Sequence, residues 1–389
     1  MKNKLTEVVW WESCITEHQV HTLNELSLLP DVMFRAFVLK HENNGRKKQG
    51  WNECDLSQID AKIIPFFSSF FILKTLKHKR KCVHVFAGPF DSLSLTLGLF
   101  FSLLMNNRTY VLTEPYSPIG AELLNNGSAF KSMVLKTLRP LKYNVLWKLI
   151  RKNIEGVFAI SPLAIKQLIL FGVNKNKILP YAYFVPSTIP KTTSNITKSS
   201  FSPVKSLKII FVGSLNYRKG LDIAIQALNK VNNDLNVILD IFGPGEIKVY
   251  PKLVNINYKG IIPFGRSQEE ISKYDILLLP SRFDGWGVVV NEALLAGIPV
   301  ICSNEVGAAG LVKKWHCGMT YDSRNVNSLV NLLVEFYNNK NLFLKEFRED
   351  VKCVQKIISP RNGAEYVINA IKSTQLNNVP QKNEWYERD

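Results

Sequence analysis

Short apolar runs alternate with amphipathic segments along most of this chain. Runs of four to eight apolar residues that end at turn residues predict buried strands, and longer segments with apolar residues three and four positions apart predict helices. The predicted strands are 8–11, 32–39, 82–86, 109–112, 156–160, 178–179, 207–212, 236–242, 276–279 and 299–301. The predicted helices include 93–104, 161–172, 221–228, 288–295, 326–357 and 359–372. This alternation predicts an α/β protein with parallel sheets.

The most informative unit runs from Ile276 to Ile301. Its first strand stops at Pro280, a turn with two glycines follows at 281–287, and a helix begins near Val288. A parallel sheet places this turn at the carboxyl ends of its strands, where ligands bind. The unpaired N–H groups of the helix start favour an anion there.

Two acids bracket the start of this helix. Asp284 lies in the turn and Glu292 lies about one turn inside the helix. A carboxylate is a poor phosphate ligand but a good acceptor for sugar hydroxyls, so the pair indicates a phosphate-linked sugar. An ordinary helix start, at which an acid favours the dipole, would explain Asp284 alone. It would not explain Glu292 and the glycine turn together.

A second motif for the same phosphate is predicted at the first strand of the C-terminal half. The strand 207–212 runs into Gly213 and Ser214, and Arg218 and Lys219 precede the next helix. A lysine at this place can meet a phosphate together with the helix dipole.

These features together resemble the retaining glycosyltransferases of family four, whose GT-B fold has two Rossmann-like domains facing a cleft. The family usually has Glu at the first acid, where this chain has Asp284, and often has Arg where this chain has Ser214. The resemblance implies sugar transfer from a UDP- or GDP-sugar with retention at the anomeric carbon, and no cofactor or metal. It assigns catalytic roles to Asp284 and Glu292, the latter on the ribose hydroxyls. The donor-binding residues that it implies are Gly213, Ser214, Arg218, Lys219, Ile262, Gly285, Trp286, Gly287, Val288 and Glu292.

The N-terminal half carries weaker signals. Related sequences have a His-Gln pair after the first strand, so the resemblance makes His18 and Gln19 candidates for acceptor binding, although a helix cap or a surface group is an alternative. Many family members have a histidine near the reaction centre where this chain has Glu114, which could bind sugar hydroxyls or take a proton, or could simply be a turn acid. His84 lies inside a predicted strand and is expected to pack in the core.

The predicted organisation is an acceptor-binding domain at 1–185, a Pro- and Ser-rich linker at 186–204 and a nucleotide-sugar domain at 205–358. The resemblance implies that helix 359–372 crosses back to the first domain. The polar segment 373–389 is expected to be a loose tail.

Charge is spread unevenly over the two halves. The chain has a net charge of +17, and residues 1–200 hold 26 Lys and Arg against 13 Asp and Glu. Such a basic half indicates a polyanionic partner, and an anionic membrane surface is the favoured one, with a lysine-rich but merely solvated surface as the alternative. Candidate contacts are the apolar run 63–73 and the basic stretch 128–153, which Pro140 is expected to break. Either could instead be core.

The remaining features narrow the class of protein. No signal peptide or bilayer-spanning run is expected, which indicates a cytoplasmic protein that can lie on the inner face of the plasma membrane. The six scattered cysteines predict neither a disulfide framework nor a metal site. A nucleotide-sugar epimerase or hydrolase with the same fold and a basic nucleic-acid-binding protein remain alternatives, although no nucleic-acid-binding module is found. The resemblance favours a glycan or lipid-linked acceptor in O-antigen or capsule synthesis.

Overall fold

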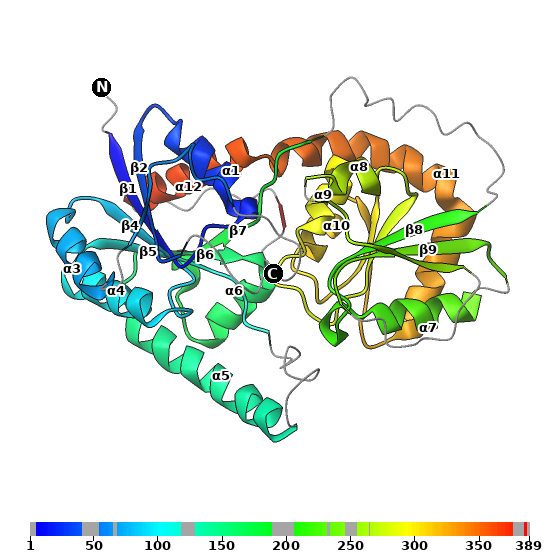
Figure 1. Cartoon of the computed structure of the whole chain (residues 1–389), viewed down its shortest axis with the longest axis horizontal. Coiled ribbons are helices and arrows are strands. Elements are labelled where there is room, and N and C mark those ends of the chain that lie inside the picture. Colours follow the sequence, from blue (N-terminus) through cyan, green and yellow to red (C-terminus); the bar gives the residue numbers. More distant parts are fainter. Residues whose placement is uncertain are drawn as a thin grey trace.

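The computed structural model places two parallel β-sheets side by side (Figure 1). It describes residues 5–40, 54–64, 68–117, 129–188, 206–231, 234–245, 255–263, 265–375 and 385–386. We call the body around the first sheet the N-terminal domain and the body around the second sheet the C-terminal domain. Most of the predicted linker lies outside the described residues.

The N-terminal domain contains a seven-stranded sheet in the order β3-β2-β1-β4-β5-β6-β7. Its strands are β1 (Thr6–Glu12), β2 (Val32–Val38), β3 (Ala61–Ile63), β4 (Val83–Ala87), β5 (Arg108–Thr113), β6 (Gly156–Ile160) and β7 (Ile178–Tyr181). Its helices are α1 (Glu17–Ser27), α3 (Ser68–His78), α4 (Leu93–Leu104), α5 (Ala129–Ile150), α6 (Ser161–Leu170) and the short 3₁₀ helix η1 (Lys175–Lys177). These strands pair with one another in parallel.

The C-terminal domain contains a six-stranded sheet in the order β10-β9-β8-β11-β12-β13. Its strands are β8 (Leu207–Val212), β9 (Val237–Phe242), β10 (Ile256–Gly260), β11 (Ile276–Leu279), β12 (Val300–Ser303) and β13 (Gly318–Tyr321). Its helices are η3 (Tyr217–Lys219), α7 (Leu221–Val231), α8 (Ser267–Ile271), α9 (Val289–Leu295), α10 (Ala309–Lys314) and α11 (Val326–Ile357), and α12 (Pro360–Gln375) follows. The predicted α/β class and two-domain GT-B architecture are confirmed.

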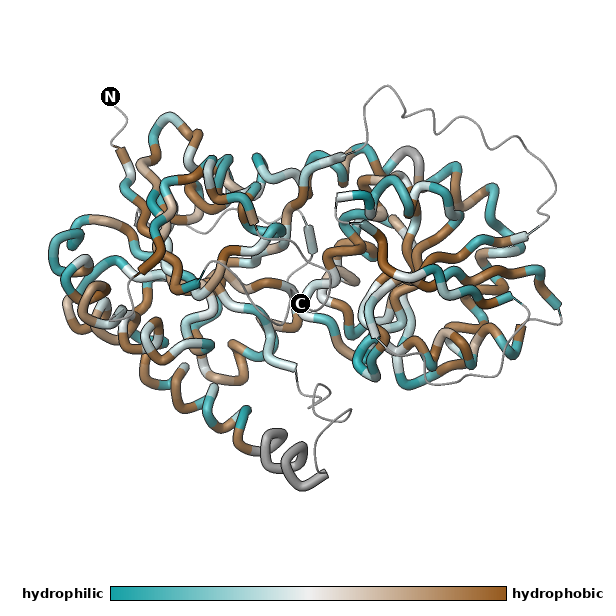
Figure 2. The backbone as a smooth tube through the Cα atoms, viewed as in Figure 1, coloured by the Kyte–Doolittle hydropathy of each residue, from teal (hydrophilic) through white to brown (hydrophobic). Residues whose placement is uncertain are grey.

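Alternating residues of β1 show why helices cover both faces of the first sheet. Val8 and Trp10 belong to one core cluster, together with residues of α1 and α12, whereas Val9 and Trp11 belong to another, together with residues of α3 and α4. A strand that is buried on both faces reads as a continuous apolar run, and this is the pattern from which the strand was predicted. Figure 2 likewise shows hydrophobic residues concentrated on the central strands of the C-terminal domain.

Each sheet has a point where its strand order reverses. In the C-terminal domain this point lies between β8 and β11, whose carboxyl ends lead to Gly213 and to the turn at 281–287. Ligands in open parallel sheets bind in the crevice outside such a point. The two predicted phosphate motifs therefore belong to neighbouring strands at one edge, although about sixty residues separate them along the chain.

Helix α12 leaves the C-terminal domain and packs against α1 of the N-terminal domain (Figure 1). Gly363 lets it pass close to the chain that joins the two sheets, because a Cβ at this position would lie 2.4 Å from the ring of Phe184. The crossing helix is thus part of the contact between the domains.

Two sequence expectations about helices and the tail are wrong. The basic stretch was expected to break at Pro140, but helix α5 continues through this residue. The proline removes one backbone N–H donor without ending the helix. The end of the chain is not simply loose, because Trp385 and Tyr386 are buried. These two large aromatic side chains bury apolar surface that holds residues 385–386 against the protein.

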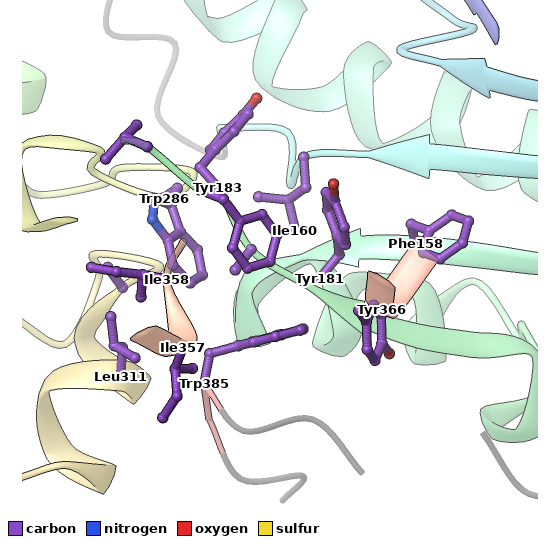
Figure 3. Close-up of a cluster of buried hydrophobic side chains, with 14 of the residues drawn as sticks. Phe158, Ile160, Tyr181, Tyr183, Trp286, Leu311, Ile357, Ile358, Tyr366 and Trp385 are labelled. Atoms are coloured by element: carbon purple, nitrogen blue, oxygen red, sulfur yellow. The ribbon is translucent and has the colours of Figure 1, made fainter. Parts of the chain in front are cut away.

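Trp385 packs at the junction of the two domains (Figure 3), and Tyr386 belongs to the same core cluster. The Trp385 ring meets Phe184 at 5.1 Å and Tyr366 of α12 at 4.8 Å between centroids, both edge to face. The Tyr386 hydroxyl lies 3.0 Å from both Ala159 O and Tyr181 O. The chain end therefore joins β6, β7 and α12 in one cluster.

Candidate active site

The turn after β11 has a backbone shape that only glycine adopts readily. Gly287 has φ +85°, and a Cβ there would lie 2.9 Å from Val306 and 3.0 Å from Leu279. This turn brings Asp284, which is buried, to the start of α9. We call residues 281–287 the donor loop.

A cluster of charges forms where the donor loop meets the chain after β8. Lys219 Nζ lies 2.6 Å from Asp284 Oδ2, and Arg218 Nη1 lies 3.7 Å from Asp284 Oδ1. Arg218 also donates to Phe283 O at 3.1 Å. The structure thus brings together three residues that the sequence assigned to one phosphate-sugar site.

A second ion pair holds the two segments in this position. Arg282 forms a two-pronged contact with Asp222 of α7, at 2.7 and 2.5 Å, and its guanidinium lies 3.9 Å from the Tyr217 ring centroid. The Arg282 N–H also donates to Arg218 O at 2.8 Å. These contacts fix the backbone on both sides of Arg218 and Lys219, so their charges are held at one place.

The loop at 305–310 is hydrogen-bonded to the donor loop along its backbone. Asp284 N donates to Glu305 O at 2.9 Å, Gly307 N donates to Asp284 O at 3.0 Å, and Ala308 N donates to Trp286 O at 2.8 Å. Gly307 also permits close contact with the N-terminal domain, since a Cβ there would lie 2.6 Å from the side chain of Ser161.

Glu292 lies on α9, one turn beyond the donor loop, and is half-buried. Its Oε1 accepts a hydrogen bond of 2.7 Å from the hydroxyl of Ser267, at the start of α8. Burial raises the pKa of the Glu292 carboxyl to about 7, and the Ser267 bond opposes this only in part. A carboxyl with this pKa changes its protonation state near neutral pH, and sequence reasoning did not anticipate Ser267.

The other predicted donor residues line the same edge. The side chain of Lys219 extends past Gly213. A Cβ added at Gly213 would lie 3.4 Å from the Cδ and Cε of this lysine. Ile262 and Val288 are partly buried against the core, and Ser214 O accepts from Asn216 N at 2.9 Å. Gly285 and Trp286 are both buried.

Glu114 faces the donor loop from the N-terminal domain. It follows β5 and is exposed, and a Cβ at Gly285 would lie 3.0 Å from Glu114 Oε2. Glu114 Oε1 accepts a hydrogen bond from the hydroxyl of Tyr183. A carboxylate of one domain thus lies beside the donor loop of the other.

The predicted acceptor pair divides into two roles. Gln19 caps α1: its Oε1 accepts from Thr16 N and Oγ1, at 3.2 and 2.7 Å, and its Nε2 donates to Glu12 Oε1 at 2.6 Å. His18 is half-buried and lies edge to face with Tyr183, at 6.0 Å between centroids. The contacts of Gln19 therefore support the helix, whereas His18 lies against the ring of Tyr183.

Sequence reasoning missed a buried chain of contacts between the donor loop and Tyr183. Trp286 Nε1 donates to Asn291 Oδ1 at 2.7 Å, and Asn291 Nδ2 donates to Tyr183 O at 2.8 Å. Asn291 stands directly before Glu292, which is the only signal that could have drawn attention to it. Tyr183 lies in a segment without any motif.

The expectation that His84 packs in the core is confirmed. His84 is buried, accepts from Trp11 Nε1 at 3.1 Å, and lies 3.0 Å from Lys79 O through Nε2. Burial lowers the pKa of His84 to about 4. The histidine is therefore neutral, and its ring serves packing and hydrogen bonding within the sheet.

Comparison with known proteins gives a family match to the C-terminal half. The family model described as "Glycosyl transferases group 1" matches residues 193–352. An uncharacterized 41.2 kDa protein in the cps region of Klebsiella pneumoniae is 26% identical over 298 residues, which are 73% of this chain and 79% of that protein. The O-antigen biosynthesis glycosyltransferase WclY of Escherichia coli is 26% identical over 199 residues, 50% of this chain and about half (52%) of its own length.

Solved structures share the whole fold. WaaG, described as a glycosyltransferase involved in lipopolysaccharide biosynthesis, aligns with TM-score 0.61 at 14% identity, covering 95% of this chain and 99% of its own. HepE of Anabaena, solved in complex with UDP and glucose, aligns with TM-score 0.64 at 11% identity, covering 95% of this chain and 100% of its own. Identities this low show the fold alone.

Proposed function

Because the chain belongs to the group 1 glycosyltransferases, the retaining enzymes of family four with the GT-B fold, we propose that it transfers a sugar from a UDP- or GDP-sugar to a hydroxyl of a lipid-linked saccharide in surface-polysaccharide synthesis. The charge cluster of Lys219, Arg218 and Asp284 beside the start of α9 is the observation that carries this proposal.

The cluster suits a diphosphate that gains charge as the sugar leaves. Lys219 and Arg218 would stabilise the departing diphosphate together with the N–H groups around Gly287. Asp284 is the counter-ion of Lys219 in this structure. A diphosphate would take over this role, which would release the Asp284 carboxylate for hydroxyls of the donor sugar.

Retention follows from attack on the face that the leaving group occupies. The bond between the anomeric carbon and the phosphate oxygen breaks, a bond from the acceptor oxygen forms on the same face, and the phosphate oxygen takes the acceptor proton. No protein nucleophile is used. Glu292 would accept hydrogen bonds from the ribose hydroxyls, and Glu114 would contact hydroxyls from the opposite domain.

The relatives of this chain support a lipid-linked saccharide as the proposed acceptor. The Klebsiella protein lies in a cps region, and WclY is named for O-antigen biosynthesis. The first domain of this chain, which faces the donor loop, is the basic half of the molecule. A saccharide carried on an anionic membrane would suit that charge.

Helix α5 is the proposed membrane contact. Leu138, Leu141, Val145 and Leu149 are 49–60% exposed and are spaced three and four residues apart, so they share one face of the helix. Arg139, Lys148 and Lys152 are exposed in the same region. The helix lies at the outer side of the N-terminal domain (Figure 1). Among the described residues, no helix has the length and apolar character needed to cross a membrane.

The run at 63–73 makes a poorer contact. Part of it lies outside the described residues, and α3 turns Ile72 and Leu76 into the core while Phe70 stays exposed. We therefore place the membrane contact on α5.

Donor identity tests the proposed function directly. The purified protein is screened with UDP- and GDP-sugars by thermal shift, and the donor that binds is then incubated with polyprenyl diphosphate-linked sugars. We expect one donor class to raise the melting temperature, and NMR of the product to show the donor's anomeric configuration. Donor binding followed by hydrolysis or epimerisation alone would contradict transfer.

Membrane attachment has a separate test. The protein is co-sedimented with vesicles of phosphatidylcholine, with and without phosphatidylglycerol, at low and high salt. Each basic residue near an anionic surface contributes about 1 kcal/mol, so binding should require the anionic lipid and weaken with salt. Leu141→Asp should reduce it, whereas Leu342→Asp, at an exposed leucine of α11, should not. Binding that does not depend on lipid charge would contradict the proposal that the basic surface around α5 binds the membrane.

A further inference from the structure

Tyr183 contacts residues from both sides of the active site. It lies just after β7, in the chain that leads from the first sheet to the second, and it is buried. Its hydroxyl donates to Glu114 Oε1, its backbone oxygen accepts from Asn291, and its ring lies against His18. Figure 3 shows the Tyr183 hydroxyl pointing away from the cluster of Trp286 and Trp385.

The side-chain amide of Asn291, which contacts Tyr183 from the C-terminal domain, can be oriented in only one way. Asn291 is fully buried, and its amide lies between the Trp286 indole and Tyr183 O. An indole N–H can only donate and a backbone oxygen can only accept, so the Asn291 oxygen must face Trp286 and its nitrogen must face Tyr183. The position of Tyr183 is thus determined from the donor loop, through the residue that precedes Glu292.

The contact to the N-terminal domain acts on a side chain that needs support. Glu114 is exposed, and holding a glutamate side chain in one rotamer costs conformational entropy. The Tyr183 bond holds Oε1, and Oε2 is the oxygen nearest to the space above Gly285. The phenol therefore directs one carboxylate oxygen toward the donor loop.

We propose that Tyr183 is a positioning residue: its hydroxyl holds the Glu114 carboxylate at the donor loop, and Asn291 holds Tyr183. This inference rests on the proposed transfer reaction. It adds that the acid of the N-terminal domain is aligned by the donor-binding helix of the C-terminal domain. Because the phenol donates, the carboxylate keeps its acceptor capacity for a sugar hydroxyl at Oε2.

The removal of a single oxygen tests the proposal. Tyr183→Phe keeps the ring and the backbone oxygen, and Tyr181→Phe is the matched control at a buried tyrosine two residues away. We expect Tyr183→Phe to lower kcat roughly tenfold to a hundredfold, the range for a hydrogen bond to a charged group, with the donor KM within about twofold. Tyr181→Phe should leave both constants near wild type.

A double-mutant cycle separates positioning from general support of the fold. If Tyr183 acts through Glu114, adding Tyr183→Phe to Glu114→Ala should cause no further loss of kcat. An equal loss of kcat in both backgrounds would overturn the proposal, and so would a loss confined to donor KM.

A measurement without turnover keeps this test distinct from that of the transfer reaction. In protein labelled with ¹³C at the glutamate carboxyl carbon, the Glu114 resonance is the one that disappears in Glu114→Gln. Tyr183→Phe should shift this resonance and Tyr181→Phe should not. An unmoved resonance overturns the positioning role even if the enzyme is active, whereas a shift in a protein that transfers no sugar upholds the contact and refutes the proposed reaction.

Discussion

The two walls of the active site are built in different ways. On the C-terminal wall, Lys219 and Asp284 come from loops after adjacent strands, and Glu292 lies one helical turn beyond the second loop. On the N-terminal wall, Glu114, Tyr183 and His18 come from three separate places, and no motif links them in the sequence. Both walls therefore use residues that lie beyond the ends of strands, but only those of the C-terminal wall belong to recognisable sequence motifs.

The walls also differ in how their charges are balanced. Asp284 has two cations near it and is buried, whereas Glu114 is exposed and is held by a phenol. A phosphate ligand demands fixed positive charge on the C-terminal wall. The opposite wall has only to place a hydrogen-bond acceptor.

The largest effect is expected on the C-terminal wall. Lys219→Ala removes the cation nearest to the developing phosphate charge, and loss of one such stabilising group costs about a hundredfold to a thousandfold in kcat. Lys230→Ala, at the exposed end of α7, is the control. Steady-state kinetics with the donor found by screening measures both variants. Turnover of Lys219→Ala within a few-fold of wild type would refute the site.

Asp284→Glu tests whether that wall is shaped for the shorter acid, even though family members usually have Glu there. Asp284 is buried between Lys219 and Gly287, whose Cβ would lie 3.7 Å from the Asp284 Cγ. One added methylene in a packed site costs about 1–3 kcal/mol. We expect a tenfold or larger fall in kcat/KM. Unchanged kinetics would show that the loop accepts either acid.

The junction between the walls is tested at the chain end. Trp385→Ala removes a ring packed against Phe184 and Tyr366, and such a deletion costs about 3–5 kcal/mol in a core. We expect a lower melting temperature and weaker donor binding, whereas a chain that ends at Tyr386 should match wild type. Differential scanning calorimetry measures the first effect, and titration with UDP measures the second. Unchanged melting would show that the aromatic pair does not support the junction.

The sequence predicted the strands best where apolar runs were bounded by turn residues. Residues 156–160, 207–212 and 276–279 are strands with the predicted limits. The short outer strands β3, β10 and β13 were not predicted, because their residues are mostly half-exposed and lack a continuous apolar run. Edge strands carry less of the burial signal that such prediction uses.

The candidate site was predictable to the extent that its residues lie in motifs. Lys219, Asp284 and Glu292 were proposed from their spacing around predicted strands and helices, and the structure places Lys219 beside Asp284. The roles of Tyr183, Asn291 and Tyr386 depend on contacts between residues about 70 to 230 positions apart. No local pattern encodes such contacts. The same holds for Gln19, whose place beside His18 suggested ligand binding but whose amide caps a helix.

The smallest expected effect concerns pH, and it belongs to the C-terminal wall alone. Burial raises the Glu292 pKa to about 7, so the carboxyl is largely protonated at pH 6. An ionised carboxylate accepts stronger hydrogen bonds from ribose hydroxyls than a protonated carboxyl does, so donor affinity should rise by up to about tenfold between pH 6 and pH 8 and then level off. Stability should move the other way. The folded state binds the Glu292 proton more tightly than the unfolded chain does. The stabilisation from this protonation is complete below the unfolded pKa of about 4.5 and is lost as the pH rises through about 7.

Glu292→Gln tests both trends because its side chain cannot ionise. Its donor affinity should therefore vary little with pH, and its melting temperature should exceed that of wild type at pH 8 but not at pH 4.5. Isothermal titration and thermal melts at these pH values measure both trends, and the same pH dependence of affinity in wild type and variant would show that Glu292 is not the titrating group.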